Sequence, residues 1–373
     1  MGSKLVIQED AYEFDVVVVG AGIIGLAIAD QLSGRYKNIL LVEKERTLGQ
    51  HTSSRNSGVI HSGIYYPKNS LKASLCLKGN QLLYGFLKKY NIPHKNCGKL
   101  IVATDAKEAN ELELIYQKGI ANNVPDLQFF NSRQIEDLQP GIKACRAIHV
   151  PSAGIVDAHS LMHQIRKNIV QKDVVMLYNN RVSDIKHNDD IYKVFFDGKD
   201  FCAKTKIVIN AAGLWSDQIS QMVGIKDYKL EWYKGEYYKT NKYRRNMKCL
   251  IYPLPDKNSL GIHTVIDMDG GISFGPNAYS TNKIDYNVDD SHQQEFCDKI
   301  NKYLDISYDD LWIDSSGIRP KIKQKKGFRD FVISNEKDKG YENFINLIGI
   351  ESPGLTCCFS IAEYVENIIE NEA

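Results

Sequence analysis

Four side chains in this sequence have types and neighbours that could do chemistry. His61 lies between two glycines directly after a polar loop, and His263 lies in a segment that is typical of an alternating strand. A neutral imidazole near pH 7 can accept a proton, so both are candidate bases. Arg319 precedes Pro320 and offers a fixed guanidinium, and Tyr252 completes the candidate catalytic set. The alternative is a structural role for His61 and a solvent-facing side chain for His263.

A dinucleotide-binding fingerprint stands near the start of the chain. Gly20, Gly22 and Gly25 have the G-x-G-x-x-G spacing, follow an apolar run at 14–19 and precede a helix-like apolar pattern. The first glycine allows a tight turn, the second a close backbone approach to a pyrophosphate, and the third close packing of helix on strand. Glu43 ends a second apolar run 23 positions after Gly20, where an acidic side chain binds an adenosine ribose. The alternative is a glycine-rich turn of another α/β fold.

Three further segments have the character of cofactor-binding loops. The polar stretch 48–66 is rich in side chains that can donate hydrogen bonds to phosphate oxygens. The turn at 211–213 consists of residues small enough to pass close to a ligand, and the turn at 349–356 offers backbone N–H groups before a closing helix. The predicted cofactor-binding residues are Gly20, Gly22, Ile23, Ile24, Gly25, Glu43, Lys44, Thr52, Ser53, Asn56, Ser57, Gly58, Val182, Ala211, Ala212, Gly213, Trp215, Arg319, Gly354, Leu355 and Thr356.

The remaining patterns predict the elements that position these residues. Short apolar or β-favouring runs predict strands at 14–19, 39–42, 99–103, 147–150, 173–178, 192–196, 207–209 and 344–348. Helices are expected at 71–90, 108–122 and 357–369, from 154–161 with Asp157 or Ser160 near the cap, and after 213 with Ser216 and Asp217 as caps. Between 228 and 310 aromatic residues alternate with polar ones, which predicts antiparallel strands that face the substrate.

Composition sets modest bounds on function. The chain has 373 residues and a formal net charge of +1, which gives no reason to expect nucleic acid as a partner. The eight cysteines have neither a C-x-x-C pair nor metal-ligand spacing, so we expect reduced thiols and no metal. No apolar run is long enough for a membrane span, and the first 14 residues lack the character of a signal or transit peptide. We therefore expect a cytoplasmic protein, with peripheral contact at the inner membrane face left open.

Several longer motifs carry a resemblance to a known family. They are VVVVGAGIIGLAIA, NSGVIHSGIYY, SLKASLCLKGN, CGKLIVA, GIVD, NAAGLWSD, KGEYY, YPLPD, GIHT, GPNA, SGIRPK and GIESPGLT. Together they resemble the D-amino-acid-oxidase-type FAD superfamily over residues 14–365, and within it L-2-hydroxyglutarate oxidases and dehydrogenases. The SGIRPK and GIESPGLT motifs are closer to bacterial relatives described only as FAD-dependent oxidoreductases, so the exact substrate stays open while the cofactor does not.

The resemblance implies a fold and a domain organisation. The expected fold class is α/β, with a Rossmann-like FAD-binding domain and a second substrate domain on an antiparallel or mixed sheet, in an α+β arrangement. The FAD-binding domain is expected to be discontinuous over 12–95, 146–225 and 315–373. The substrate domain is expected to comprise 96–145 and 226–314.

The resemblance also implies a flavoprotein oxidoreductase that oxidises a small carboxylate substrate, most closely L-2-hydroxyglutarate to 2-oxoglutarate. Arg319 matches the position that binds the substrate carboxylate, and His61 or His263 would accept the hydroxyl proton while hydride passes to flavin N5. A second carboxylate would need another cation, for which Lys234, Arg244 and Arg245 are candidates. Oxygen or a quinone would reoxidise the flavin.

Two alternatives stay open at this point. One is an oxidase or dehydrogenase of another small substrate, such as an amino acid or glycerol 3-phosphate. A phosphate would favour several basic residues converging on the pocket, and the sequence near the motifs indicates no such cluster. The other is a non-catalytic flavin-binding assembly factor, against which the presence of His61 and Arg319 speaks.

Overall fold

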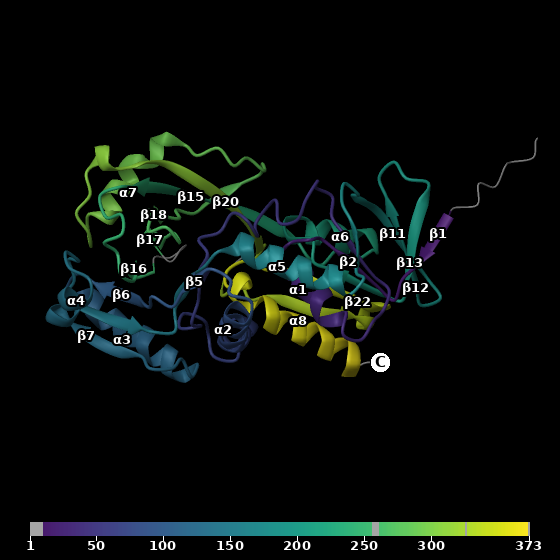
Figure 1. The fold of residues 1–373 in the computed structure, drawn as a ribbon, viewed down its shortest axis with the longest axis horizontal. Coiled ribbons are helices and arrows are strands. Elements are labelled where there is room, and N and C mark those ends of the chain that lie inside the picture. Colours follow the sequence, from purple (N-terminus) through teal and green to yellow (C-terminus); the bar gives the residue numbers. More distant parts are fainter. Residues whose placement is uncertain (1–9, 256–260, 325–326, 372–373) are drawn as a thin grey trace, which may run out of the picture.

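The computed structural model describes residues 10–255, 261–324 and 327–371. Its elements fall into two groups that form the two ends of an elongated molecule (Figure 1). One group contains the chain start and the closing helix, and the other contains most of the middle of the sequence.

A six-stranded sheet forms the centre of the first group. Its strands follow the order β10 (Val175–Leu177), β3 (Ile39–Val42), β2 (Val16–Val19), β14 (Ile207–Asn210), β22 (Tyr341–Ile348) and β21 (Val332–Glu336). The first five are parallel and β21 is antiparallel to β22. Continuous apolar strands of this kind are buried on both faces, and every residue of β2 and β3 is buried. The buried strands that the sequence predicts at 14–19, 39–42, 207–209 and 344–348 are confirmed as β2, β3, β14 and β22.

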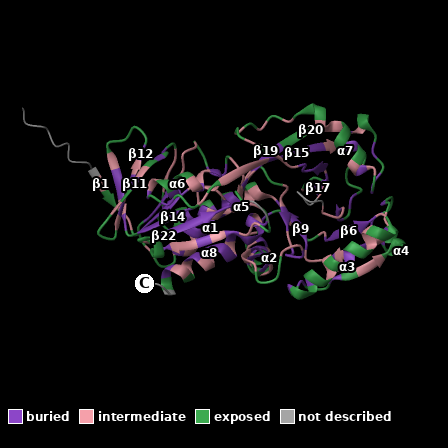
Figure 2. Cartoon of the chain, turned by 180° about the vertical axis from the view of Figure 1, so that it is seen from behind, coloured by how far each residue is buried: buried purple, intermediate pink, exposed green. Residues whose placement is uncertain are grey.

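Helices cover one face of this sheet and a second sheet covers the other. The helices are α1 (Ile23–Leu32), α2 (Leu71–Lys89), α5 (Ala158–Gln171) and α8 (Gly354–Asn371), with α8 packed on both α1 and α2. On the opposite face lie α6 (Ser216–Met222) and the sheet β1 (Asp10–Glu13), β13 (Phe201–Thr205), β12 (Ile191–Phe196) and β11 (Val182–Asn188). Figure 2 shows the buried residues concentrated in β14, β22 and α1.

The second group contains the antiparallel strands predicted for the middle of the chain. One sheet comprises β17 (His263–Ile266), β18 (Ile272–Gly275), β15 (Leu230–Thr240), β19 (Tyr279–Thr281) and β20 (Trp312–Ile322), which pairs with β15. A second comprises β16 (Leu250–Tyr252), β6 (Lys99–Ala103), β8 (Arg146–Val150) and β7 (Gln128–Asn131). The helices α3 (Ala106–Ala121), α4 (Ser132–Leu138) and α7 (Gln293–Ile300) pack against these sheets. The mixed α/β fold class is confirmed, whereas the domain boundaries stay a prediction.

Two features join the groups. A small sheet of β4 (Val59–Ile60), β9 (Gly154–Val156) and β5 (His94–Lys95) lies at their junction, and the 11-residue strands β15 and β20 run from the second group toward the first (Figure 1). Among the described residues, no helix has the length and apolar character that a bilayer crossing requires.

Three predicted local features differ from the structure. The segment 154–161 begins as strand β9, and α5 starts only at Ala158, with the Asp157 carboxylate accepting hydrogen bonds from the backbone N–H groups of His159 and Ser160. Neither Ser216 nor Asp217 caps α6. Trp215 occupies the cap position, and Asp217 instead accepts a hydrogen bond from the Leu230 backbone N–H at 3.0 Å. The closing helix starts three residues earlier than predicted, at Gly354.

Candidate functional site

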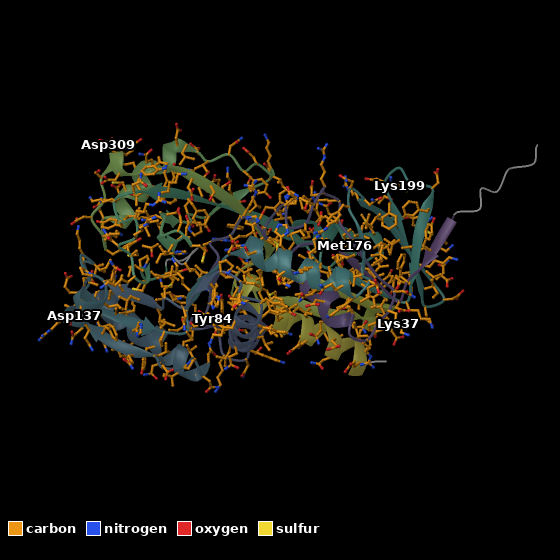
Figure 3. The ribbon with its side chains drawn as sticks, in the orientation of Figure 1. Lys37, Tyr84, Asp137, Met176, Lys199 and Asp309 are labelled. Carbon is orange, nitrogen blue, oxygen red and sulfur yellow. The ribbon has the colours of Figure 1, made fainter. Side chains whose placement is uncertain are left out.

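A cavity of about 990 Å³ lies between the two groups and receives side chains from both. Its floor consists of residues at the carboxyl ends of β2, β3 and β14, and its other side of residues from β15, β17 and β20. In open parallel sheets this edge is where ligands bind. The exposed side chains of Lys37, Asp137, Lys199 and Asp309, which Figure 3 labels, lie at the outer edges of the molecule, well away from this junction.

Two glycines of the fingerprint are required by close backbone contacts. Gly20 has φ +106°, and a Cβ there would lie 2.5 Å from the Ala211 carbonyl oxygen. A Cβ on Gly25 would lie 1.9 Å from the Gly20 carbonyl oxygen, a distance that no side chain can occupy. Any larger residue at either position would therefore push α1 away from β2 or β2 away from the turn after β14.

The start of α1 is held by two side chains from elsewhere in the first group. The Ser53 hydroxyl accepts a hydrogen bond from the Ile23 backbone N–H at 3.0 Å, and a Cβ on Gly22 would lie 2.9 Å from that hydroxyl. The Glu43 carboxylate accepts hydrogen bonds from the backbone N–H groups of Ala21 at 2.9 Å and of Glu45 at 3.0 Å. Ser53 thus supplies the cap that Gly22 lacks, and Glu43 is fixed at the end of β3.

The polar loop after Glu43 is stabilised largely by its own side chains. Thr52 donates a hydrogen bond to the Ile318 carbonyl oxygen at 3.1 Å and so ties the loop to β20. The Asn56 side chain donates to the Ser53 carbonyl oxygen at 2.8 Å and accepts from the Gly58 N–H at 2.8 Å. These groups are partly engaged within the protein, and their contact with a cofactor stays a prediction.

A cluster of aromatic and charged residues lies at this end of the cavity, and of its members only Tyr286 was missed. The Lys44 ammonium lies 3.7 Å from the Trp215 ring centroid, and the His51 ring packs edge-on against Trp215 at 4.7 Å. His51 also hydrogen-bonds Tyr286 at 2.8 Å, and the Arg55 guanidinium lies 3.8 Å from the Tyr286 ring centroid. Lys44 and Trp215 were predicted, and His51 and Arg55 stand in the predicted loop. Tyr286 carried no signal, because only the fold brings it to this loop.

The two candidate bases share the far end of the cavity and are both held neutral. Burial first, and then the positive charges of Lys99 and Arg319 together with the neighbouring histidine, hold the pKa of His61 well below its usual value. Burial lowers the pKa of His263 to about 3, with Lys99 and Arg319 acting in the same direction. Both imidazoles are therefore unprotonated near pH 7 and can accept a proton.

The hydrogen bonds of the two histidines differ. The His61 Nε2 lies 3.2 Å from the Ser352 hydroxyl, and its backbone N–H donates to the Thr356 hydroxyl at 3.0 Å. The His263 Nδ1 lies 3.2 Å from the Thr264 carbonyl oxygen. Because a carbonyl only accepts, this contact assigns the proton to Nδ1 and leaves the Nε2 lone pair of His263 as an acceptor.

Tyr252 does not line the cavity. Its ring stacks on His263 with 3.8 Å between centroids and an interplanar angle of 8°, and its hydroxyl is buried without a hydrogen-bond partner among the described residues. Burial holds its pKa well above the usual value. Tyr237 lines the cavity instead; burial raises the pKa of its hydroxyl, and the nearby Arg319 guanidinium and Ser57 hydroxyl act in the opposite direction. A direct catalytic contact of Tyr252 is thus less favoured by the geometry than a supporting position behind His263.

Several cations converge on the cavity, contrary to the expectation from the sequence. Lys72, Lys118, Arg319, Lys321 and Arg329 all line it. Lys72 pairs with the Glu351 carboxylate at 3.0 Å, and Arg329 pairs with Glu231 at 3.3 Å. The five cations come from α2, α3, β20 and the loop after β20, so no single sequence motif could have revealed the cluster.

The three cations proposed for a second carboxylate lie elsewhere. Lys234 is buried against the Glu236 carboxylate at 3.4 Å, and Arg244 pairs with Asp269 at 2.7 Å on the surface. Arg245 packs around the turn at Gly270. None of the three lines the cavity as the described residues define it.

Most of the predicted site residues meet in this one cavity. Those that line it are Gly20, Gly22, Ile23, Ile24, Glu43, Lys44, Thr52, Ser53, Asn56, Ser57, His61, Val182, Ala211, Ala212, Gly213, Trp215, His263, Arg319, Gly354 and Leu355. Gly25, Gly58, Tyr252 and Thr356 lie behind it. Of these, Thr356 is fully buried and orients His61, as described above.

Comparison with known proteins decides the family. A family model described as DAO, FAD dependent oxidoreductase, matches residues 15–368. The chain belongs to the DAO family of FAD dependent oxidoreductases. It is therefore an enzyme of the oxidoreductase class, and the FAD cofactor that the family resemblance implied is confirmed.

Individual relatives point to two substrate classes. The mitochondrial L-2-hydroxyglutarate dehydrogenase of Arabidopsis thaliana is 33% identical over 95% of this chain and 83% of its own length. The glycerol 3-phosphate dehydrogenase of Caloramator mitchellensis is 30% identical over 96% of this chain and 74% of its own length. The FAD-bound structure of L-alpha-glycerophosphate oxidase from Mycoplasma pneumoniae is 25% identical over 96% of this chain and 95% of that chain, with a TM-score of 0.86.

The residues of this DAO-family chain fit FAD. Gly20 makes the tight turn after β2, and Gly22, which lines the cavity at the start of α1, has no side chain that would keep a pyrophosphate from the backbone. The N-termini of α1 and α8 both reach the lining of the same cavity, and a helix N-terminus favours negative charge. Glu43 would hold the ribose, and the turns at 211–213 and 353–355 would border the flavin.

Proposed function

We propose that this DAO-family enzyme oxidises a small 2-hydroxy acid, most specifically L-2-hydroxyglutarate to 2-oxoglutarate. The observation that carries the proposal is the meeting of two neutral histidines and one guanidinium, His61, His263 and Arg319, at one end of the FAD cavity. A 2-hydroxy acid needs a cation for its carboxylate and a base for its hydroxyl proton. An amino acid can enter with its amine already neutral and needs no such base.

The chain's own residues would divide the work as follows. Arg319 would bind the C1 carboxylate through its planar guanidinium, next to the Tyr237 hydroxyl, whose pKa the Arg319 charge lowers. One of the two histidines would take the hydroxyl proton at its free ring nitrogen, a role that the assigned tautomer of His263 leaves open at Nε2. FAD, when bound, accepts the hydride from C2.

Glycerol 3-phosphate is the second candidate substrate. Lys72, Lys321 and Arg329 line the cavity together with Arg319, and such a group of cations suits a dianionic phosphate. The two glycerophosphate-oxidising relatives support the same candidate. Under either substrate the electron acceptor, oxygen or a quinone, and a cytoplasmic location with peripheral membrane contact stay predictions.

An anaerobic titration of the purified holoenzyme tests the proposal. The flavin absorbance would be followed on addition of L-2-hydroxyglutarate, then D-2-hydroxyglutarate, glycerol 3-phosphate and a set of amino acids. We expect bleaching by L-2-hydroxyglutarate alone. Bleaching by glycerol 3-phosphate alone would establish the second candidate, and a flavin that stays oxidised with every compound would favour a non-catalytic flavoprotein.

A further inference from the structure

Lys99 is a buried cation that the proposed mechanism does not use. It is the first residue of β6, its side chain has no solvent exposure, and its ammonium has no hydrogen-bond partner or ion pair among the described residues. The ammonium lies 4.5 Å from the ring centroid of Tyr252 and 4.9 Å from that of Tyr65. Burial lowers the pKa of Lys99 to about 8, so it stays mostly protonated at pH 7.

The two tyrosines beside this ammonium are also unsatisfied. The hydroxyls of Tyr65 and Tyr252 are both buried, and neither has a hydrogen-bond partner in the described parts of the chain. Leaving one buried polar group without a partner costs about 1–3 kcal/mol, and more for a charged one. These three donors, one ammonium and two hydroxyls, lie close together, which indicates that an acceptor from outside the described residues completes the group.

The position of this group relative to the cavity identifies what that acceptor would belong to. Tyr65 lines the cavity, and Tyr252 stacks on His263, which lines it as well. The charge of Lys99 acts on both His61 and His263. The group therefore borders the end of the cavity where the candidate bases meet Arg319.

We propose that Lys99, Tyr65 and Tyr252 form a subsite for the second carboxylate of a dicarboxylate substrate. The inference rests on the proposed function and deepens it. A carboxylate is an acceptor-only group with two oxygens, and one ammonium with two hydroxyls supplies the donors that it needs. Tyr65 lines the cavity while Lys99 and Tyr252 lie behind that lining, so the Tyr65 side chain would have to move for a carboxylate to reach them. The three residues stand in the segments HSGIYY, CGKLIVA and IYPLPD, which are among the motifs that resemble L-2-hydroxyglutarate enzymes.

The other cations near the cavity are less suited to this role. Lys72 is paired with Glu351 at 3.0 Å and Arg329 with Glu231 at 3.3 Å. Lys321 shares the influence of Glu351 and lies 4.8 Å from the Tyr233 ring centroid, toward the side where Lys72 and Arg329 gather. Lys99 has no acidic neighbour of this kind within the described residues, so a bound carboxylate would be its only counter-charge.

Ligand binding to the holoenzyme tests the subsite without requiring turnover. Glutarate and pentanoate have chains of the same length and differ in one terminal carboxylate, and their dissociation constants would be measured from the change in flavin absorbance. We expect the wild type to bind glutarate more tightly than pentanoate, and Lys99→Met to lose that preference by about 10- to 100-fold. Tyr65→Phe and Tyr252→Phe should each reduce it by a few-fold to about 10-fold, and Lys321→Met should leave it in place.

The outcomes separate the subsite from the substrate. A wild type without preference for glutarate, a Lys99→Met variant that keeps the preference, or a loss confined to Lys321→Met would each overturn the subsite. If Lys99→Met does not retain FAD, the two tyrosine variants decide, because each removes one hydroxyl only. A loss of preference in a protein that L-2-hydroxyglutarate does not reduce would support the subsite and disprove the proposed substrate. If L-2-hydroxyglutarate reduces the flavin but Lys99→Met keeps the preference for glutarate, the proposed substrate is supported and the subsite is disproved.

Discussion

The two sides of the cavity are built on different physical principles. The side predicted to hold the cofactor, here called the cofactor side, comprises 20–24, Glu43, 49–57, 211–215 and 353–355. It is shaped by backbone, by glycines without space for a Cβ, and by side chains that hydrogen-bond one another. The opposite side, here called the substrate side, comprises His61, Tyr65, Tyr237, His263 and Arg319. It consists of large buried or half-buried side chains, and the Tyr65 hydroxyl, like the Lys99 ammonium and Tyr252 hydroxyl behind it, has no hydrogen-bond partner among the described residues.

This difference explains how the two sides respond to change. The cofactor side is satisfied within the chain, so its failure should appear as lost stability or lost FAD. The substrate side keeps neutral bases and unpaired donors in a dry place, so its failure should appear in rate and binding. Variants on each side test whether the two sides fail in these different ways.

The largest effect is expected for the proton acceptor on the substrate side. Replacing the catalytic base by asparagine, in His61→Asn or His263→Asn, should lower the rate constant of flavin reduction by about 10²–10⁴-fold, because a positioned base contributes that much. Rapid-mixing measurements under anaerobic conditions with saturating substrate would show it. Replacing the histidine that is not the base should lower this rate constant by less than about 10-fold. His51→Asn on the cofactor side serves as the control. Equal rates in all three variants would exclude a histidine base.

A substitution in the glycine fingerprint should give the next largest effect, which we expect in the free energy of unfolding. Gly25→Ala places a Cβ 1.9 Å from the Gly20 carbonyl oxygen, so α1 must move and about 3 kcal/mol of unfolding free energy should be lost together with FAD. Denaturant unfolding and the flavin content of the purified protein measure both. Gly85→Ala is the matched control, since its Cβ would meet no atom within 4 Å in the helix α2. That variant should be neutral or more stable.

The same contrast decides how much the sequence could predict. The cofactor side was accessible because Gly20, Gly22, Gly25 and Glu43 lie in one βαβ unit whose spacing is set by local geometry. The strands around this unit are continuous apolar runs, so the fold class followed as well.

The substrate side was only partly accessible. His61, His263 and Arg319 were found through glycine neighbours, a strand pattern and a family motif. Lys72 and Lys321 were not, because they come from α2 and β20, which are far apart in the sequence, and only the fold brings them to one cavity. Lys234 was wrongly placed, since an alternating strand does not reveal that Glu236, two residues away on the same face, binds its ammonium.

The carboxylate-binding role of Arg319 gives the third prediction. Arg319→Ala should weaken substrate binding by about 1.5–3 kcal/mol, or roughly 10- to 100-fold, because a charge-assisted hydrogen bond is lost in a dry site. The concentration of substrate that half-saturates flavin reduction measures this. Arg319→Lys should recover part of the loss at most, since lysine lacks the planar pair of donors. Unchanged saturation in Arg319→Ala would disprove the assignment.

The buried histidines predict how stability depends on pH. His263 has its pKa lowered from 6.5 to about 3 in the folded protein, so the unfolded chain binds a proton in this window that the folded chain does not. The contribution of this group to stability should therefore be present above about pH 6.5 and be lost as the pH falls from there toward about 3, with about 1 kcal/mol lost over the first pH unit and a slope that then approaches about 1.4 kcal/mol per unit. Denaturant unfolding at pH 6.5 and 5.5 measures the slope. The slope in His263→Asn should be smaller, and an identical slope would place the proton elsewhere.

The smallest effect is expected where the cofactor side satisfies itself. Ser53→Ala removes the acceptor of the Ile23 backbone N–H, and the loss of such a helix cap typically costs about 1 kcal/mol. Ser54→Ala is the matched control, because its hydroxyl donates only to the His51 carbonyl oxygen within the loop, and it should change stability by less than about 0.5 kcal/mol. Thermal unfolding of both holoenzyme variants compares them. Equal shifts would mean that α1 does not depend on Ser53, and that the cofactor side is less self-satisfied than its hydrogen bonds indicate.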